Sequence, residues 1–226
     1  MEDIDAIAAL QDPVRRRLYE YVAAQGREVG RNEAAEAAGV TRTLAAHHLD
    51  RLTEAGLLES GSRRLTGRSG PGAGRPAKVY TRARAERAVS LPARDYRTAA
   101  ELLAEAAEEA GLDAGLCTAA RRRGEALRGS AAACGSLEEA MELLAARGYE
   151  PHLEGVEGTT GAAARVVRMR NCPFHAVAER FPPLVCGMNL ALLEGLFGTD
   201  GPLHARMDAR PGECCVVVED SKNNID

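Results

Sequence analysis

Hydrophobic positions recur at helical spacing through the first part of the chain. The first predicted helix begins at Asp12-Pro13, where Asp suits the capping position and Pro the first helical position, and it ends at Gly26. Two further helices are predicted over 31–38 and 42–55, each closed by a glycine of the kind that ends helices. The pattern therefore predicts three helices in close succession.

Two short strands are predicted after the helices, over 57–60 and 77–81. The segment between them is dense in Gly, Pro and Arg, which is typical of a hairpin tip rather than of packed structure. Three helices followed by a basic hairpin make a winged helix-turn-helix, whose last helix enters the major groove of DNA. Residues 1–86 are therefore predicted to form a winged helix-turn-helix DNA-binding domain.

The second half of the chain changes from helices to alternating strands. Its predicted elements are helices over 90–111, 115–134 and 136–147, strands over 152–156 and 165–170, an apolar helical stretch over 173–197, and strands over 203–208 and 214–219. We expect a helical dimerisation or linker region over 87–148 and an α+β sensor domain over 149–226. The predicted fold class is α+β, with the winged helix-turn-helix first, the helical dimerisation segment next and the sensor domain last.

The composition narrows the class of protein. Of the 226 residues, 45% are hydrophobic, which is enough for a buried core, but no run approaches the roughly 18 apolar residues of a membrane span. The N-terminus is acidic and lacks the basic and apolar regions of a secretory signal. We therefore expect a cytoplasmic protein with no membrane partner, in which the six cysteines stay reduced and form no disulfide framework.

The net charge of −4 conceals an uneven distribution. Residues 1–86 carry 14 Lys and Arg against 12 Asp and Glu, whereas the rest of the chain carries 15 against 21. Residues 60–85 hold seven basic side chains and no acidic one. A concentrated basic segment in an acidic protein predicts a local anion-binding surface, and the alternative is a solvated loop.

The helix predicted over 42–55 would present its first residues to base edges in the major groove. Arg42 can donate two hydrogen bonds to guanine, and such a pair discriminates against the wrong base by roughly 1–3 kcal/mol. Basic side chains of the wing would bind phosphates or the minor groove and add affinity rather than specificity. The alternative is a winged helix that binds only proteins. The candidate DNA-binding residues are Thr41, Arg42, Thr43, His47, His48 and Arg51 in the helix and Arg63, Arg64, Arg68, Arg75 and Lys78 in the wing.

Residues 1–86 resemble the ArsR-like winged-helix repressors of bacteria, and the motif EAAEAAGVTRTLAAHHLDRLTEAGLLE carries the resemblance. It implies a double-stranded DNA operator with two half-sites and a homodimer that binds them. An apolar stripe on the helix predicted over 90–111 would supply one dimer contact, and the alternative is packing within one chain. The stripe consists of Leu91, Ala99, Leu102, Leu103, Ala106 and Ala110.

Two cysteines near the C-terminus are predicted to lie at helix ends. Because proline is disruptive inside a helix, two consecutive prolines divide the apolar stretch into helices over about 173–180 and 183–197. Cys172 then occupies the capping position of the first helix, and Cys186 lies in the first turn of the second. Free backbone N–H groups at helix N-termini favour the thiolate and also suit an anionic metal cluster.

The other four cysteines differ in their predicted roles. Cys214 and Cys215 are neighbours on a predicted strand, so their side chains would point to opposite faces and only one of them would bind a metal. Cys117 and Cys134 lie in an alanine-rich helical region, where a free cysteine is usually a small buried hydrophobe.

The second half resembles the SufR-type regulators, which are iron–sulfur repressors built on the ArsR-like domain. The segments NCPFHAVAERFPPLVCGMNLALLEGLFG and RPGECCVVV carry the resemblance. It implies an iron–sulfur cluster, with 4Fe-4S expected ahead of 2Fe-2S, that is bound by Cys172, Cys186 and Cys214 and controls repression of cluster-assembly genes. The interval between the first two cysteines is one residue longer than the family pattern, so the fourth ligand stays open between His175 and Cys215.

The sequence therefore predicts a homodimeric transcriptional repressor and redox sensor whose operator affinity is controlled by an iron–sulfur cluster. The alternative is a zinc- or thiol-redox-responsive winged-helix regulator without such a cluster, because cysteine spacing alone does not choose the metal. An enzyme that uses Cys172 with His175 is disfavoured, since no Asp or Asn orienting group and no cofactor loop is evident. No small-molecule substrate is expected.

Overall fold

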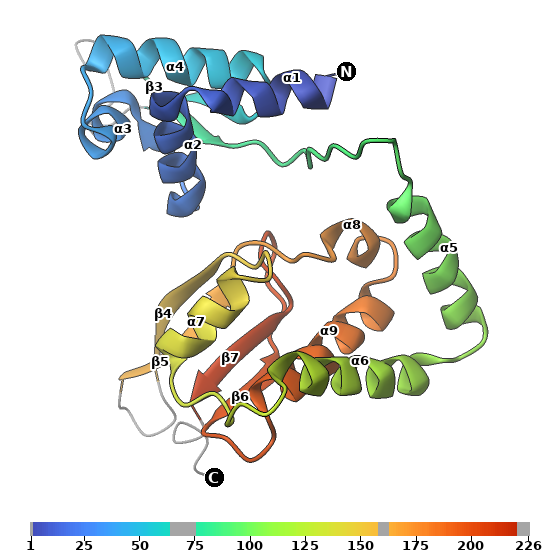
Figure 1. Ribbon diagram of the computed structural model, residues 1–226. Helices are drawn as coiled ribbons and strands as arrows, with labels where there is room; N and C mark the ends of the chain where they lie inside the picture. Colours follow the sequence, from blue (N-terminus) through green and yellow to red (C-terminus); the bar gives the residue numbers. More distant parts are fainter. Residues whose placement is uncertain (1, 64–75, 158–162, 221–226) are drawn as a thin grey trace. The chain divides into compact units, whose positions relative to one another are not determined.

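The computed structural model describes residues 2–63, 76–157 and 163–220. The chain divides into two compact units, Met1–Arg94 and Asp95–Asp226. Figure 1 labels most of the elements of both. The boundary falls inside the region that the sequence assigns to a helical linker, so the helices after residue 94 belong to the same unit as the C-terminal strands.

The first unit is a winged helix-turn-helix. Its elements are α1 (Glu2–Ala8), a 3-10 turn (Ala9–Gln11), α2 (Pro13–Gln25), β1 (Val29–Gly30), α3 (Arg31–Ala38), α4 (Arg42–Glu54), β2 (Leu58–Arg63) and β3 (Ala77–Arg82). The strands form an antiparallel sheet in the order β1-β3-β2. The three predicted helices and the hairpin are confirmed, whereas α1 and the two-residue β1 were not predicted.

Local sequence signals fix the helix ends of this unit. The Asp12 carboxylate accepts hydrogen bonds from the backbone N–H groups of Val14 and Arg15, both at 2.9 Å. Gly39 ends α3 in the left-handed region at φ 66°, which a side chain would disfavour. The Thr41 hydroxyl then caps α4 by accepting from the Leu44 N–H at 3.3 Å. The turn between α3 and α4 therefore follows from the sequence itself.

The second unit combines helices with a four-stranded antiparallel sheet in the order β4-β5-β7-β6. Its elements are α5 (Tyr96–Glu109), α6 (Asp113–Arg128), α7 (Leu137–Ala145), β4 (Pro151–Glu157), β5 (Ala163–Met169), α8 (His175–Ala178), α9 (Pro182–Phe197), β6 (Leu203–Met207) and β7 (Val216–Asp220). Both predicted hairpins are confirmed, and the two units together confirm the α+β fold class.

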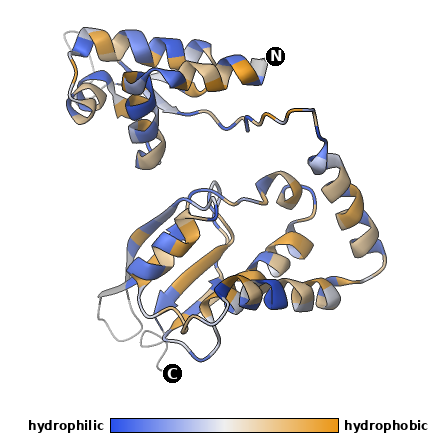
Figure 2. Ribbon diagram, in the orientation of Figure 1, coloured by the Kyte–Doolittle hydropathy of each residue, from blue (hydrophilic) through white to orange (hydrophobic). Residues whose placement is uncertain are grey.

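The core of the second unit lies between its helices and the sheet. Residues of α7, α9, β5, β6 and β7 form one buried apolar cluster. Figure 2 shows that α9 and β7 are among the most apolar elements of the unit. This placement explains why α9 lacks the two-faced pattern of a surface helix: it is covered by the sheet on one side and by α6 on another.

Helices α6 and α9 cross in backbone contact. A Cβ atom on Gly124 would lie 2.1 Å from the Leu192 carbonyl oxygen, and one on Gly195 would lie 2.1 Å from the Arg121 carbonyl oxygen. Only glycine fits at these two positions, because real Cβ atoms do not approach backbone so closely. The crossing fixes α9, which carries Cys186, against α6.

Candidate functional site

The outer face of α4 presents the residues predicted to reach DNA. Arg42, Thr43 and His47 are exposed, and Arg42 makes no ion pair within the described part of the chain. Arg51 is also exposed, but its guanidinium binds the Glu54 carboxylate at 3.0 Å. Thr41 is exposed as well, although its hydroxyl already caps the helix. Arg42 is therefore the cation on this face that is most available to a base edge.

His48 requires a correction. Its side chain is buried within the helix-turn-helix unit, and its Nδ1 atom lacks a hydrogen-bond partner among the described residues. Burial lowers the pKa of His48, although the nearby Asp12 carboxylate acts in the opposite direction. His48 therefore packs inside the unit instead of facing DNA.

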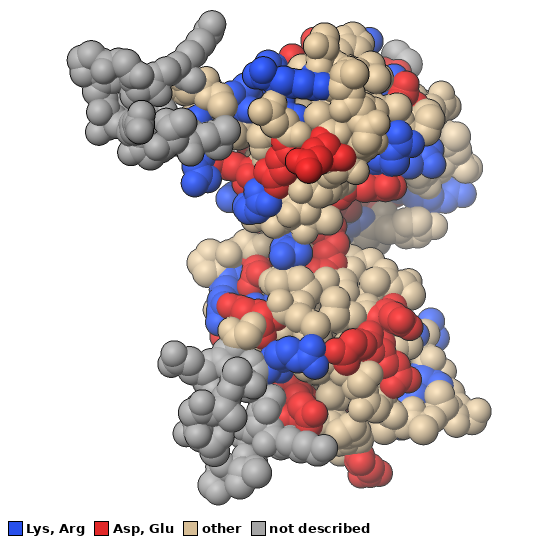
Figure 3. All heavy atoms as spheres, turned by 90° about the vertical axis from the view of Figure 1, so that its left-hand side faces the viewer, with Lys and Arg blue, Asp and Glu red and all other residues tan. Residues whose placement is uncertain are grey.

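The described wing residues are held in ion pairs. Arg63 binds Glu28 at 3.2 Å, and Lys78 binds Asp50 at 2.8 Å. The predicted phosphate-binding residues Arg64, Arg68 and Arg75 lie outside the described residues. On the face drawn in Figure 3, basic and acidic side chains are interspersed over the described part of the helix-turn-helix unit.

Asp50 links the recognition helix α4 to the wing. Its carboxylate accepts hydrogen bonds from Lys78 Nζ at 2.8 Å, from the Tyr80 hydroxyl at 2.7 Å and from Arg31 at 3.1 Å. Burial alone would raise the pKa of Asp50, but the hydrogen bonds from Lys78 and Tyr80 hold it below its usual value. This cluster was not predicted, because its members come from α3, α4 and β3.

Four cysteines from three separate segments of the second unit lie together. The side chains of Cys172 and Cys215 interact with that of Cys214, and Cys215 also interacts with Cys186. The prediction that only one of Cys214 and Cys215 could face the others is wrong, because both precede β7, which begins at Val216. The alternation of a strand therefore does not separate their side chains.

The predicted helix-end positions are shifted in the structure. Cys172 lies two residues before Phe174, which caps α8, and the Phe174 backbone N–H acts to lower the pKa of Cys172. Cys186 is the fifth residue of α9 instead of a member of its first turn, since α9 begins at Pro182. Cys172 is therefore the one of the two that a free backbone N–H group reaches.

The predicted fourth-ligand candidates separate clearly. His175 is 66% exposed and pairs with Glu179 at 3.2 Å, so it does not join the thiols. Cys215 joins them.

Cys134 is buried, which raises its pKa to about 11, as expected of a core thiol. Cys117 lies on α6 beside Gly187, the residue after Cys186.

A buried arginine anchors the segment that carries Cys214 and Cys215. The Arg168 guanidinium forms ion pairs with Glu154 and Asp208 and lies 3.8 Å from Glu213. Backbone hydrogen bonds hold the same segment, from Asp208 to Cys215 at 2.8 Å and from Cys214 to the Met169 carbonyl at 2.8 Å. The thiols of this segment are therefore held in place by β5 and by the end of β6.

The sulfur of Cys214 is the one that most readily carries negative charge. Hydrogen bonds from Cys172 and Cys215 lower its pKa, and the Val216 N–H and the Asn189 amide act in the same direction. The pKa values of Cys172 and Cys215 rise, because their thiols donate to Cys214 and are partly buried.

A buried polar pair extends from this sulfur into the core. The Asn189 Nδ2 atom donates to Cys214 Sγ at 3.4 Å, and the Tyr149 hydroxyl donates to Asn189 Oδ1 at 2.5 Å. Burial raises the pKa of Tyr149, and the neighbouring Cys172, Cys214 and Cys215 raise it further, so the hydroxyl stays protonated. The pair was not predicted; the available signal was a lone Asn within an apolar helical run.

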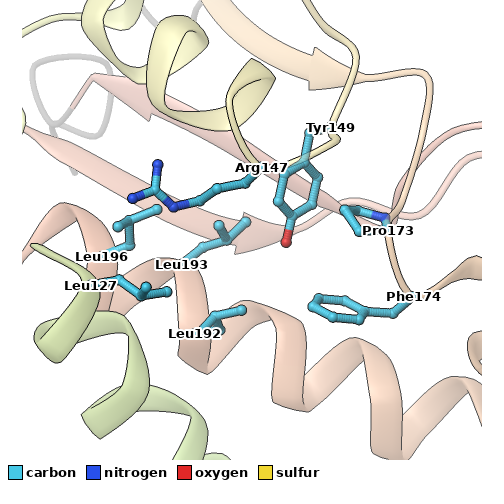
Figure 4. A pocket seen from close by; sticks show the side chains of 8 residues that line it. All are labelled: Leu127, Arg147, Tyr149, Pro173, Phe174, Leu192, Leu193 and Leu196. Atoms are coloured by element: carbon cyan, nitrogen blue, oxygen red, sulfur yellow. The ribbon is translucent and has the colours of Figure 1, made fainter. Parts of the chain in front are cut away.

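An apolar cavity of about 160 Å³ is lined by Tyr149, Phe174 and several leucines, and Arg147 is the charged residue in its lining. Figure 4 shows Tyr149 extending toward α9 with its hydroxyl pointing between Leu193 and Phe174. The Arg147 guanidinium donates to the Leu143 carbonyl at 2.8 Å, so it is already engaged. The cavity thus offers little polar chemistry of its own.

The donor set has the chemistry of a soft-metal site. Thiolates select iron–sulfur clusters, zinc and copper(I) over hard cations. Within the described ranges, no three His, Cys, Asp or Glu side chains are arranged to hold a metal ion as they stand. A cluster makes a different demand from a single ion, since its thiolates bind more than one iron and the sulfurs need not converge on one point. The four thiols therefore fit an iron–sulfur cluster in donor chemistry.

Comparison with known proteins identifies the first unit. Residues 10–61 match the family model of a helix-turn-helix domain, which spans the chain from before α2 into β2. No curated protein and no solved structure matches the chain. Across the part of the chain that is described, no helix is long and apolar enough to cross a membrane. The chain carries a helix-turn-helix domain, and this domain indicates a DNA-binding transcriptional regulator.

Proposed function

We propose that the protein is a transcriptional repressor whose operator affinity is controlled by an iron–sulfur cluster bound by Cys172, Cys186, Cys214 and Cys215. The observation that carries the proposal is the gathering of these four thiols from three segments of the second unit. When bound, such a cluster would supply reversible one-electron chemistry and sensitivity to oxidants.

The thiols are suited to report cluster state because they join segments that are otherwise separate. Cys172 precedes α8, Cys186 lies on α9, and Cys214 and Cys215 precede β7. A group bound by all four would add covalent links between these segments, and its loss would remove those links. Metal binding that requires several chain segments stabilises the folded arrangement that brings them together.

The first unit supplies the DNA contact in this proposal. Arg42 would donate to a guanine edge from the start of α4, and the exposed Thr43 and His47 would lie along the same groove. Arg63 and Lys78 would bind phosphates only by exchanging their present carboxylate partners. Specificity is therefore assigned to α4 and non-specific affinity to the wing.

The exposed face of α5 supports the proposed homodimer. Tyr96, Ala99, Leu103, Ala106 and Ala110 follow one another at alternating intervals of three and four residues, which is the spacing of a coiled-coil seam. Leu103 is 73% exposed, and no residue of α5 is buried. A second copy of the chain would cover this stripe and present two helix-turn-helix domains to two half-sites.

The opposite face of α5 connects the stripe to the cysteine site. Ala104 and Ala107 pack against the apolar cluster around Phe181, and Arg180 binds Glu101 of α5 at 2.5 Å. Phe181 lies between α8 and α9, the helices beside Cys172 and Cys186. A change at the thiols could thus alter how α5 meets its partner, which would be allosteric if the two states prefer different DNA-binding arrangements.

The proposal is tested on protein purified without oxygen. We expect visible absorbance with iron and acid-labile sulfide in the wild type, and loss of all three in Cys186→Ser but not in Cys134→Ser, the core-thiol control. The clustered wild type should bind operator DNA more tightly than the cluster-free protein, and Arg42→Ala should weaken operator binding by roughly 10- to 100-fold. Zinc without sulfide would instead support a zinc regulator, and an unchanged Cys186→Ser variant would refute the ligand assignment.

A further inference from the structure

We propose that Tyr149 and Asn189 are positioning residues for the cysteine site, which hold the Cys214 sulfur by a fixed N–H···S hydrogen bond and thereby set the reduction potential and retention of the bound cluster. This inference rests on the proposed function, because it requires that a cluster is bound.

The geometry places a side-chain amide donor on the Cys214 sulfur. Asn189 Nδ2 lies 3.4 Å from Cys214 Sγ, within the range of a hydrogen bond to sulfur. Asn189 lies on α9 one helical turn after Cys186, so the same helix supplies both a thiol and the donor to another thiol. The Asn189 side chain is 1% exposed, so water does not compete for its amide.

Tyr149 determines which end of the amide faces the sulfur. Its hydroxyl donates to Asn189 Oδ1 at 2.5 Å, which occupies the carbonyl end and leaves the N–H end toward Cys214. Tyr149 is itself buried, and it enters the site from the segment between α7 and β4. The amide is therefore oriented from outside α9, by a residue of the segment between α7 and β4.

The free-energy cost of burying the polar pair Tyr149 and Asn189 indicates that the pair has a role at the site. A buried amide without hydrogen bonds is strongly unfavourable, and Leu190 and Leu193 beside it show that this part of α9 otherwise packs as apolar core. An Asn here is tolerated because both ends are satisfied, and one of them is satisfied by a sulfur. The chain thus retains a polar pair where a leucine would pack without one.

An N–H donor on a ligand sulfur stabilises negative charge there. A cluster carries one more negative charge after reduction, so the hydrogen bond stabilises the reduced form more than the oxidised form and raises the potential. Groups that orient metal ligands also affect retention, and their removal typically weakens binding on the order of 10- to 100-fold.

The experiment compares four proteins reconstituted with iron and sulfide without oxygen: the wild type, Asn189→Leu, Tyr149→Phe and Leu193→Ala. We expect the midpoint potential to become more negative in Asn189→Leu, to shift less in the same direction in Tyr149→Phe, and to stay unchanged in Leu193→Ala. The last variant removes a buried side chain one turn further along α9 and controls for loosened packing. Loss of the cluster to an iron chelator should be on the order of 10- to 100-fold faster in Asn189→Leu.

The outcomes separate the two proposals. A wild type that binds no cluster overturns the proposed function and this inference with it. A wild type that binds a cluster, with potentials in Asn189→Leu and Tyr149→Phe equal to its own, overturns this inference alone. An equal shift in Leu193→Ala assigns the effect to packing and also overturns it. If Asn189→Leu does not fold, Tyr149→Phe decides, because it removes only a hydroxyl and keeps the ring.

Discussion

In each unit a charged cluster ties a segment with candidate functional residues to the rest of the unit, and the two clusters have opposite composition. In the first unit, the carboxylate of Asp50 accepts from Arg31, Lys78 and Tyr80 and joins α4 to β3. In the second unit, Arg168 is surrounded by carboxylates and holds the segment that leads to Cys214.

The clusters differ most in their exposure to solvent. The Asp50 side chain is 40% exposed, whereas the Arg168 side chain is 1% exposed. Solvent and salt weaken the first cluster, and either partner can be solvated if the other is removed. A buried charge has no such alternative, so removing its partners or the charge itself is costly. The wing should therefore be adjustable relative to α4, while the cysteine segment should be rigid until the unit itself opens.

The largest expected effect follows from replacing Arg168 with Leu. The substitution leaves the carboxylates of Glu154, Asp208 and Glu213 close together without their shared cation, and we expect a loss of about 3–5 kcal/mol in the stability of the second unit. Hydrogen exchange followed along a urea series, which reports each unit separately, should show this loss in residues 95–220 and no change in the first unit.

A matched control lies on the same strand. Arg165 pairs with Glu138 at 3.2 Å, and both side chains are largely exposed, so Arg165→Ala should change stability by less than about 1 kcal/mol. Arg168→Lys should fall between the two, because an ammonium keeps the charge but not the several donors of a guanidinium. Equal effects of Arg168→Leu and Arg165→Ala would contradict the distinction between buried and exposed clusters.

A smaller effect is expected when Asp50 is replaced with Ala. Three donors lose their acceptor. Arg31 and Lys78 are partly exposed and can be solvated, but Tyr80 is 1% exposed, so the first unit should lose about 1–3 kcal/mol. Operator affinity should fall because β3 is no longer held to α4. Charge repulsion predicts the opposite, since removing a carboxylate near DNA would increase affinity.

Gel-shift titration of Asp50→Ala therefore distinguishes a positioning role from a purely electrostatic one. Glu54→Ala is the control, because Glu54 lies on the same helix and pairs with Arg51 at the surface. It should leave stability nearly unchanged. Tighter operator binding by Asp50→Ala than by the wild type would contradict a positioning role for Asp50.

The two clusters also show what the sequence could and could not predict. Helices α2, α3 and α4 were predicted because their ends depend on neighbours in the chain, such as the Asp12 carboxylate and the glycine at position 39. The burial of His48 was within reach as well, since Ala45, His48, Leu49 and Leu52 recur at helical spacing on the buried face of α4.

The remaining features depend on contacts between distant segments. Arg168 meets Asp208 across 40 positions, and Tyr149 likewise meets Asn189 across 40 positions. Periodicity carries no information about such pairs. The direction of the Cys215 side chain was mispredicted for a local reason, since the strand was expected to begin at residue 214 but β7 begins at Val216. A strand that begins two residues later than predicted was enough to reverse the expected direction of one thiol.

The smallest expected effect concerns two histidines, the buried His48 of the first unit and the partly buried His152 of the second. Burial lowers the pKa of His48, with Arg15 and His47 lowering it further and Asp12 opposing them, and burial likewise lowers the pKa of His152 despite the nearby Glu213. In the unfolded chain these groups bind a proton near pH 6.5, so the folded state binds fewer protons below that pH. The stability from each neutral histidine is complete above about pH 6.5 and decreases as the pH falls toward the folded pKa. Between pH 7 and 5.5 the loss is at most about 1.4 kcal/mol for each group.

His48→Leu should remove this pH dependence from the first unit and leave it in the second, as measured by urea unfolding at the two pH values with hydrogen exchange corrected for its intrinsic rate. A first unit that retains the same dependence without His48 would assign it to carboxylates such as Asp12 instead.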